Sequence, residues 1–161
     1  MMHRVVLFLA ICLGIQAVAV AADRKPSTGQ TLYIPVYAYV WHGNRDSKGI
    51  ARLSEVATLV SVRNTDPLRS LKLMSAKYHA TSGKQLAEWL PQPKTLAPLE
   101  TAEFFIDRSA VEGGSGASVI LRWEAGEPVN PPVAQALHLD VKTNSSLSFT
   151  TNGVVVERPG K

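Results

Sequence analysis

The chain has 161 residues, a formal net charge of +4, 45% hydrophobic and 19% charged residues, and one cysteine. This length suggests one domain with a sizeable core, and the ordinary apolar content argues against intrinsic disorder. A single cysteine excludes an internal disulfide framework, and the basic residues are too dilute to predict a nucleic-acid partner.

The first 21 residues have the pattern of a secretory signal peptide. A short basic head precedes an apolar run from Val5 to Ala22, and Ala19-Val20-Ala21 matches an A-x-A cleavage site. We therefore expect residues 1–21 to be removed and the protein to be periplasmic or secreted, with no stable membrane insertion after cleavage. The alternative is an uncleaved segment that anchors the protein in the membrane, since about 18 apolar residues approach the length that spans a bilayer.

Cleavage would also remove Cys12, the single cysteine. The mature chain would then lack any thiol, which excludes thiol catalysis and cysteine metal sites. Export without disulfides fits a bacterial periplasm better than an animal secretory route.

Short strands separated by turn residues follow the lead-in of residues 22–29. The first is predicted from Gln30 to Trp41, because its side chains alternate between apolar and aromatic. Further strands are predicted at residues 53–63, 70–81, 101–107, 117–124, 133–141, 147–151 and 154–156. Residues 84–90 suit either a strand or one turn of helix, and the prolines from Pro91 to Pro98 predict an extended connection.

Seven to nine short strands without a long helix predict an all-β fold. We expect an antiparallel two-sheet sandwich of immunoglobulin-like architecture, formed by one domain over residues 30–157 with a short tail at residues 158–161. A small β-barrel is the runner-up.

Several stretches together resemble a known family. They are Leu32-Tyr33-Ile34-Pro35-Val36-Tyr37 with His42-Gly43, Ser61-Val62-Arg63-Asn64-Thr65-Asp66-Pro67, Lys94-Thr95-Leu96-Ala97-Pro98-Leu99, Gly113-Gly114-Ser115-Gly116-Ala117, Pro128-Val129-Asn130 and Ser148-Phe149-Thr150. In this order they resemble an exported bacterial family catalogued only as a domain of unknown function, from about Gly29 to Val156. The resemblance implies no activity, substrate or site residues.

The strongest local signal is the aromatic face of the first predicted strand. Tyr33, Tyr37, Tyr39 and Trp41 occupy alternating positions on it. Aromatic rings with polar tips offer rigid contact area for a sugar, a peptide or a protein partner. Pro35 indicates an edge strand or a bulge, and an edge strand could accept a strand from a partner. The alternative is that this face is simply the second buried side of the strand.

A polar loop follows this strand directly. It contains His42, Asn44, Arg45 and Asp46. With His79 or His138 and a carboxylate, His42 could bind zinc or copper, although the spacing of these histidines matches no known ligand pattern. The alternative is a solvated loop.

Other motifs give no sign of catalysis. Gly113–Gly116 lacks the lysine of a phosphate-binding loop and leads into a strand, so it indicates a flexible hairpin or a loop packed against backbone. No serine has a nucleophile-elbow context. We therefore expect a non-enzymatic, monomeric binding or accessory module without a cofactor. Its partner would be an envelope protein or small ligand, bound through Tyr33–Trp41 and the loop to Asp46. A small-ligand or metal-binding protein, and then a hydrolase, are the alternatives.

Overall fold

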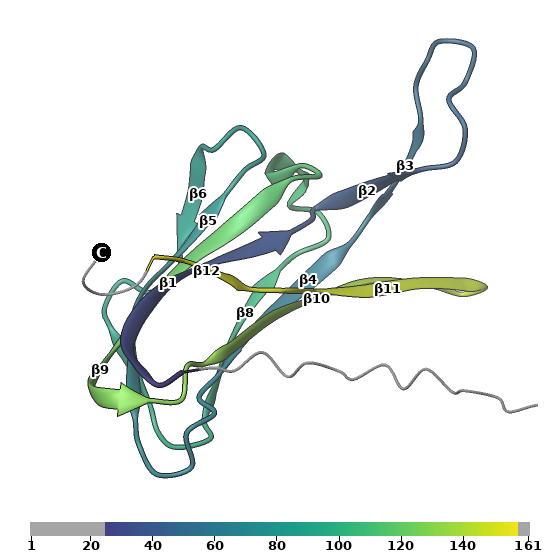
Figure 1. Cartoon of the computed structure of the whole chain (residues 1–161). Coiled ribbons are helices and arrows are strands. Elements are labelled where there is room, and N and C mark those ends of the chain that lie inside the picture. The colour runs from purple at the N-terminus through teal and green to yellow at the C-terminus, as the bar shows by residue number, and fades with distance from the viewer. Residues whose placement is uncertain (1–24, 158–161) are drawn as a thin grey trace, which may run out of the picture.

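The computed structural model describes residues 25–157, which form two large antiparallel sheets packed face to face and one separate two-stranded sheet (Figure 1). The strands are β1 (Ser27–Val36), β2 (Tyr39–His42), β3 (Arg52–Glu55), β4 (Ala57–Arg63), β5 (Leu71–His79), β6 (Gln85–Glu88), β7 (Lys94–Leu96), β8 (Thr101–Ile106), β9 (Ala117–Val129), β10 (Val133–Lys142), β11 (Ser145–Asn152) and β12 (Val154–Glu157), with one 3-10 turn, η1 (Val111–Gly113). The predicted signal peptide, residues 1–21, and the predicted tail, residues 158–161, lie outside the described residues.

The first sheet has the strand order β12-β1-β9-β5-β6, and β7 also pairs with β5. The second sheet has the order β11-β10-β4-β8, and β2 pairs only with β3. Within residues 25–157 neither sheet closes on itself, so the predicted two-sheet sandwich is confirmed and the small barrel is wrong. The finer prediction of immunoglobulin-like architecture stays a prediction.

The core lies between the two sheets because the strands alternate apolar and polar side chains. On β1, Leu32, Ile34 and Val36 are buried, whereas the residues between them are half-buried. They pack in one cluster with buried side chains of the second sheet, such as Val60 and Val62. A period of two places alternate residues on one face, so long central strands such as β1 and β9 contribute about every second side chain to this core.

The predicted strand from Gln30 to Trp41 is two strands. β1 ends at Val36, and β2 begins at Tyr39 in a different ladder. Of the two possibilities for Pro35, an edge strand or a bulge, the edge is wrong for residues 31–33 of β1, which lie between β12 and β9, whereas residues 34–36 pair with β9 alone. Pro35 is tolerated because β12 pairs with β1 only at residues 31–33, so the proline's missing N–H falls beyond that ladder.

The remaining differences follow from short or interrupted ladders. The predicted strand at residues 53–63 is divided at Val56 into β3 and β4, and residues 84–90 contain the strand β6 rather than a helical turn. The proline-rich connection contains β7, which pairs with residues 71–73 of β5. β9 extends through Pro128, where no partner strand requires its missing N–H.

The Asn64–Asp66 turn fastens the loops at one end of the sandwich. The Asn64 amide donates to the carbonyls of Arg69 (2.8 Å) and Ala97 (2.9 Å). The Asp66 carboxylate accepts from the N–H groups of Leu68 and Arg69 (2.9 Å each) and from the N–H of Asn130 (3.1 Å). These hydrogen bonds, the one from Leu68 first, lower the pKa of Asp66. The buried polar groups of this turn therefore serve the fold.

Two hairpins project from the other end of the sandwich (Figure 1). One is the β2–β3 ladder with its loop, residues 39–55, which we call the β2–β3 hairpin. The other is the far part of β10 and β11. The β2–β3 hairpin connects β1 of the first sheet to β4 of the second.

Candidate binding surface

The chain leaves the first sheet at Tyr37, where its main chain turns to the second sheet. The Tyr37 N–H donates to Nε2 of His138 (3.1 Å), and the Tyr37 carbonyl accepts from the Thr58 hydroxyl (3.1 Å). One residue on, Ala38 donates to the carbonyl of Gly114 and accepts from the N–H of Val56. These bonds replace the β1 ladder and direct the following residues into the hairpin.

The Tyr37 ring belongs to an aromatic cluster at the base of both hairpins. His138 and Phe149 stack with their ring centroids 4.4 Å apart, and Tyr37 meets both rings edge-on at 5.5 and 5.6 Å. His138 is fully buried, and burial lowers its pKa to about 4 because the charged imidazolium would lose its hydration. His138 is therefore a neutral core residue near neutral pH.

The β2–β3 hairpin carries the exposed Trp41 beside the half-buried Tyr39. Tyr39 and Trp41 meet edge-on with a centroid distance of 5.4 Å. Opposite them in the ladder are Glu55 and Leu53, which share their face because directly paired residues point the same way. Trp41 is 51% exposed and Leu53 is 44% exposed. This face is thus an accessible apolar surface, outside the sandwich core.

The loop at the hairpin tip has a defined turn. The Asp46 carboxylate accepts from the N–H groups of Lys48 (2.8 Å) and Ile50 (2.9 Å), while the Asp46 N–H donates to the carbonyl of Ile50. Gly43 and Gly49 have φ values of 69° and 79°, a region that favours glycine. The turn presents Ile50 to solvent, with its side chain 56% exposed.

Arg108, just after β8, links the bases of the two hairpins. Its guanidinium lies 3.8 Å from the Glu55 carboxylate and 3.4 Å from that of Asp140 on β10. Asp140 is buried and also pairs with Lys142 at 2.9 Å. These ion pairs and the Tyr37 cluster fasten the hairpin to the sandwich at its base.

The predicted site residues separate into three places. Tyr33 lies on the outer face of the first sheet, opposite Val154 and Ile120, and Tyr37 lies in the aromatic cluster. The other predicted residues are on the hairpin: Tyr39, Trp41, His42, Asn44, Arg45 and Asp46. The prediction of one continuous aromatic row is therefore wrong, because the main chain turns between Val36 and Tyr39.

Sequence reasoning missed Leu53, Ile50 and Arg108. Leu53 is an apolar residue five positions before the largely buried Thr58–Val62 stretch, and it could have been found by pairing residues 39–42 antiparallel to residues 52–55. Arg108 carries no local signal, since its partners are 32 and 53 residues away in the sequence.

The histidines do not gather into a metal site. Within residues 25–157 no group of three or more His, Cys, Asp or Glu side chains could hold a metal ion. His42 lies 3.3 Å from the Ser54 hydroxyl, His79 lies 3.2 Å from the carbonyl of Lys77, and His138 is buried in the aromatic cluster. The predicted combinations of His42 with His79 or His138 are therefore not assembled.

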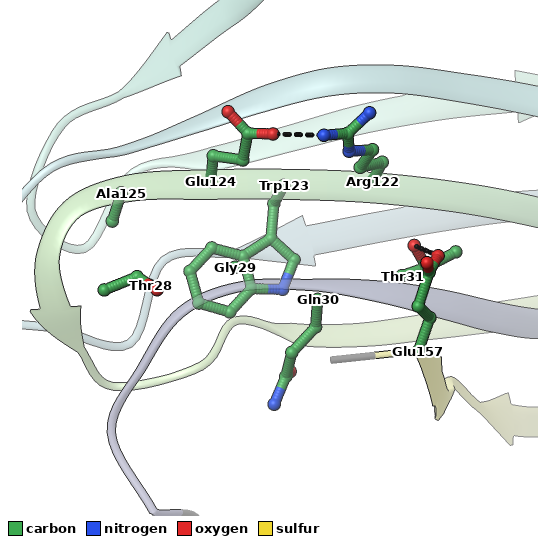
Figure 2. A pocket seen from close by; sticks show the side chains of 9 residues that line it. All are labelled: Thr28, Gly29, Gln30, Thr31, Arg122, Trp123, Glu124, Ala125 and Glu157. Atoms are coloured by element: carbon green, nitrogen blue, oxygen red, sulfur yellow. Dashed lines mark hydrogen bonds and ion pairs between the residues drawn. The ribbon is translucent and has the colours of Figure 1, made fainter. Parts of the chain in front are cut away.

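A hollow of about 440 Å³ lies elsewhere, along β1, β9 and the end of β12 (Figure 2). Its charged groups are already engaged, since Arg122 pairs with Glu124 and Glu157 accepts from the Thr31 hydroxyl at 2.9 Å. Gln30 and Trp123 also line it. Gln30 is next to Thr31 on β1, and Trp123 lies between Arg122 and Glu124 on β9, so both side chains point to the other face of the sheet and are buried toward the core. We therefore do not place the binding surface in this hollow.

Comparisons with known proteins extend the family resemblance. The family model described as Protein of unknown function (DUF3124) matches residues 29–156, and the chain belongs to this family. No curated protein matches the sequence. The crystal structure of Thermotoga maritima 1070 is similar over 80% of this chain and 96% of that chain, at 15% identity and a TM-score of 0.47. In the part of the chain that the structure describes, no helix is long and apolar enough to cross a membrane.

Proposed function

We propose that this protein is exported to the bacterial envelope and acts there as a binding module without catalysis. Export is supported by the signal-peptide pattern of residues 1–21. Binding is supported by one observation above all: Trp41, Ile50 and Leu53 are exposed together on a projecting hairpin that contributes little to the sandwich core.

Exposed apolar groups on such an element are costly in water unless they meet a partner. The hairpin is also held in place in the unbound protein, by the Tyr37 cluster and the Arg108 ion pairs. A surface that is already ordered loses less conformational entropy on binding. The proposed recognition surface is therefore the Tyr39–Trp41–Leu53 face together with the tip loop.

Hydrogen exchange of the exported protein, with and without a native envelope extract, tests this proposal. We expect amides of residues 39–55 to gain protection with the extract, whereas amides of β9 keep the protection that the core already provides. The double variant Trp41→Ser/Leu53→Ser should lose the gain. Leu68→Ser, which changes an exposed leucine at the opposite end, is the matched control and should retain it. Unchanged exchange of residues 39–55 in the wild type would refute the proposal.

A further inference from the structure

We infer that the hairpin binds an anionic lipid surface, into which its end inserts to the depth of the headgroups. This inference rests on the proposed function and names the partner of the same surface. It is carried by the charge of the hairpin end, by the distribution of its apolar side chains and by its projection from the sandwich.

The end of the hairpin is basic. Arg45, Lys48 and Arg52 are exposed there, and the one acidic group is the Asp46 carboxylate, which is held by two N–H groups of its own turn. The next carboxylate along the strand, Glu55, lies at the base beside Arg108. Basic side chains near an anionic leaflet are attracted to it over about a Debye length. The charge of the tip therefore complements an anionic surface.

Apolar side chains accompany these charges on one face of the hairpin and at its tip. Trp41 and Leu53 share one face of the ladder, Ile50 belongs to the tip loop, and Arg52 lies on the opposite face beside His42. Tryptophan combined with basic residues is typical of groups that settle at a membrane–water interface. A fluid bilayer can surround an inserted tip, so it can receive the Trp41–Leu53 face together with Ile50 while the basic side chains meet the headgroups.

The position of the hairpin allows this contact. Its tip extends away from both sheets (Figure 1), so it can reach a flat surface before the rest of the domain does. Four residue pairs of a ladder span about 10 Å, which matches the roughly 5–10 Å to which interfacial elements enter a bilayer. An acidic protein face is the competing partner, and the test below separates the two.

The test is binding of the exported protein to vesicles of phosphatidylcholine with and without phosphatidylglycerol. We expect sedimentation with the phosphatidylglycerol vesicles only, weakening as salt is added. The variant Arg45→Gln/Lys48→Gln should lower the partition coefficient about 25-fold, because each basic residue near an anionic leaflet contributes roughly fivefold. The control Lys72→Gln/Lys84→Gln removes two exposed lysines of β5 and its following turn and should change binding little.

Trp41 supplies a second, independent measurement. Trp123 is buried and Trp89 is stacked between Tyr78 and Phe104, so Trp41 is the tryptophan that a bilayer can reach. Its emission should shift to the blue on phosphatidylglycerol vesicles and be quenched by brominated lipids. Trp41→Phe should remove both signals while the protein still sediments.

Each outcome decides between the two proposals. If the vesicles do not bind, or bind equally well after Arg45→Gln/Lys48→Gln, the lipid inference is wrong. If an envelope extract from which lipids have been removed then still protects residues 39–55, the proposed function stands with a protein partner. If neither vesicles nor extract protect the hairpin, both proposals fail.

Discussion

The main-chain N–H of Tyr37 donates a hydrogen bond to Nε2 of His138, joining residues that are 101 positions apart in the sequence. This bond lies where the chain leaves the first sheet, and with the bonds of Tyr37 and Ala38 to Thr58, Gly114 and Val56 it directs the chain into the hairpin. Because Nε2 accepts, the neutral imidazole carries its proton on Nδ1. The bond also separates Tyr37, which packs in the aromatic cluster, from Trp41, which is exposed on the hairpin.

The first prediction follows from that division. Tyr37→Ala removes a ring packed on His138 and Phe149, and it should lower the free energy of unfolding by about 3 kcal/mol. Trp41→Ala removes a half-exposed ring whose aromatic neighbour is Tyr39, and it should cost less than about 1 kcal/mol. Urea unfolding of both variants provides the measurement. Equal losses would mean that Trp41 is part of the core.

This comparison shows how far the sequence alone predicts the molecule. Alternation identifies the buried face of β1 correctly, because Leu32, Ile34 and Val36 face one core. It cannot reveal that the chain turns at Tyr37, because that turn depends on His138, Thr58 and Gly114, all distant in the sequence. The alternation in the sequence thus assigns aromatic residues to a strand. Whether each ring packs in the fold or is exposed to solvent depends on contacts with residues that are distant in the sequence.

The second prediction concerns pH. Burial holds the pKa of His138 at about 4, below its ordinary 6.5, so between these values the unfolded chain binds a proton that the folded protein does not. The free energy of unfolding should have its full value above pH 6.5 and should fall by up to about 3 kcal/mol as the pH decreases toward 4. Urea unfolding at a series of pH values gives the curve.

His138→Gln is the variant for this prediction, because its side-chain oxygen can still accept from the Tyr37 N–H. It should flatten the stability curve between pH 6.5 and 4, even if it is less stable at neutral pH. His42→Gln changes an exposed histidine on the hairpin and should leave the curve as in the wild type. A steep curve retained in His138→Gln would assign the pH dependence to another group.

The third prediction concerns Gly113, which ends η1. Its carbonyl accepts from both the N–H (2.8 Å) and the hydroxyl (3.0 Å) of Thr81, and a Cβ added at this position would collide with the Tyr78 hydroxyl. This loop is therefore closely packed, which was one of the two expectations for Gly113–Gly116. Gly113→Ala should cost about 2 kcal/mol or more, as overpacking does.

Gly126 provides the control for Gly113, because no atom lies within 4 Å of the Cβ that alanine would add there. Gly126→Ala should be neutral within about 0.5 kcal/mol. Thermal unfolding of the two variants side by side separates the effect of crowding from that of simply losing a glycine. Similar melting temperatures for both would contradict the close packing of Gly113 against Tyr78.

The fourth prediction concerns Leu99, which has a φ of 61° in the turn between β7 and β8. The turn is closed by a hydrogen bond from the Glu100 N–H to the Ala97 carbonyl (3.0 Å). The Asn64 side-chain amide donates to the same carbonyl. A leucine in the left-handed region costs about 1 kcal/mol, and asparagine tolerates this region better.

Leu99→Asn should therefore raise the free energy of unfolding by about 0.5–1 kcal/mol, even though it removes an apolar side chain. Little burial is lost, since Leu99 is 66% exposed. Leu99→Gly should gain less, because glycine also gives the unfolded chain more freedom. Leu68→Asn, at an exposed leucine outside the left-handed region, should change stability little. Urea unfolding ranks the three variants by their free energy of unfolding. A loss of stability in Leu99→Asn would show that the leucine side chain contributes more than its backbone strain costs.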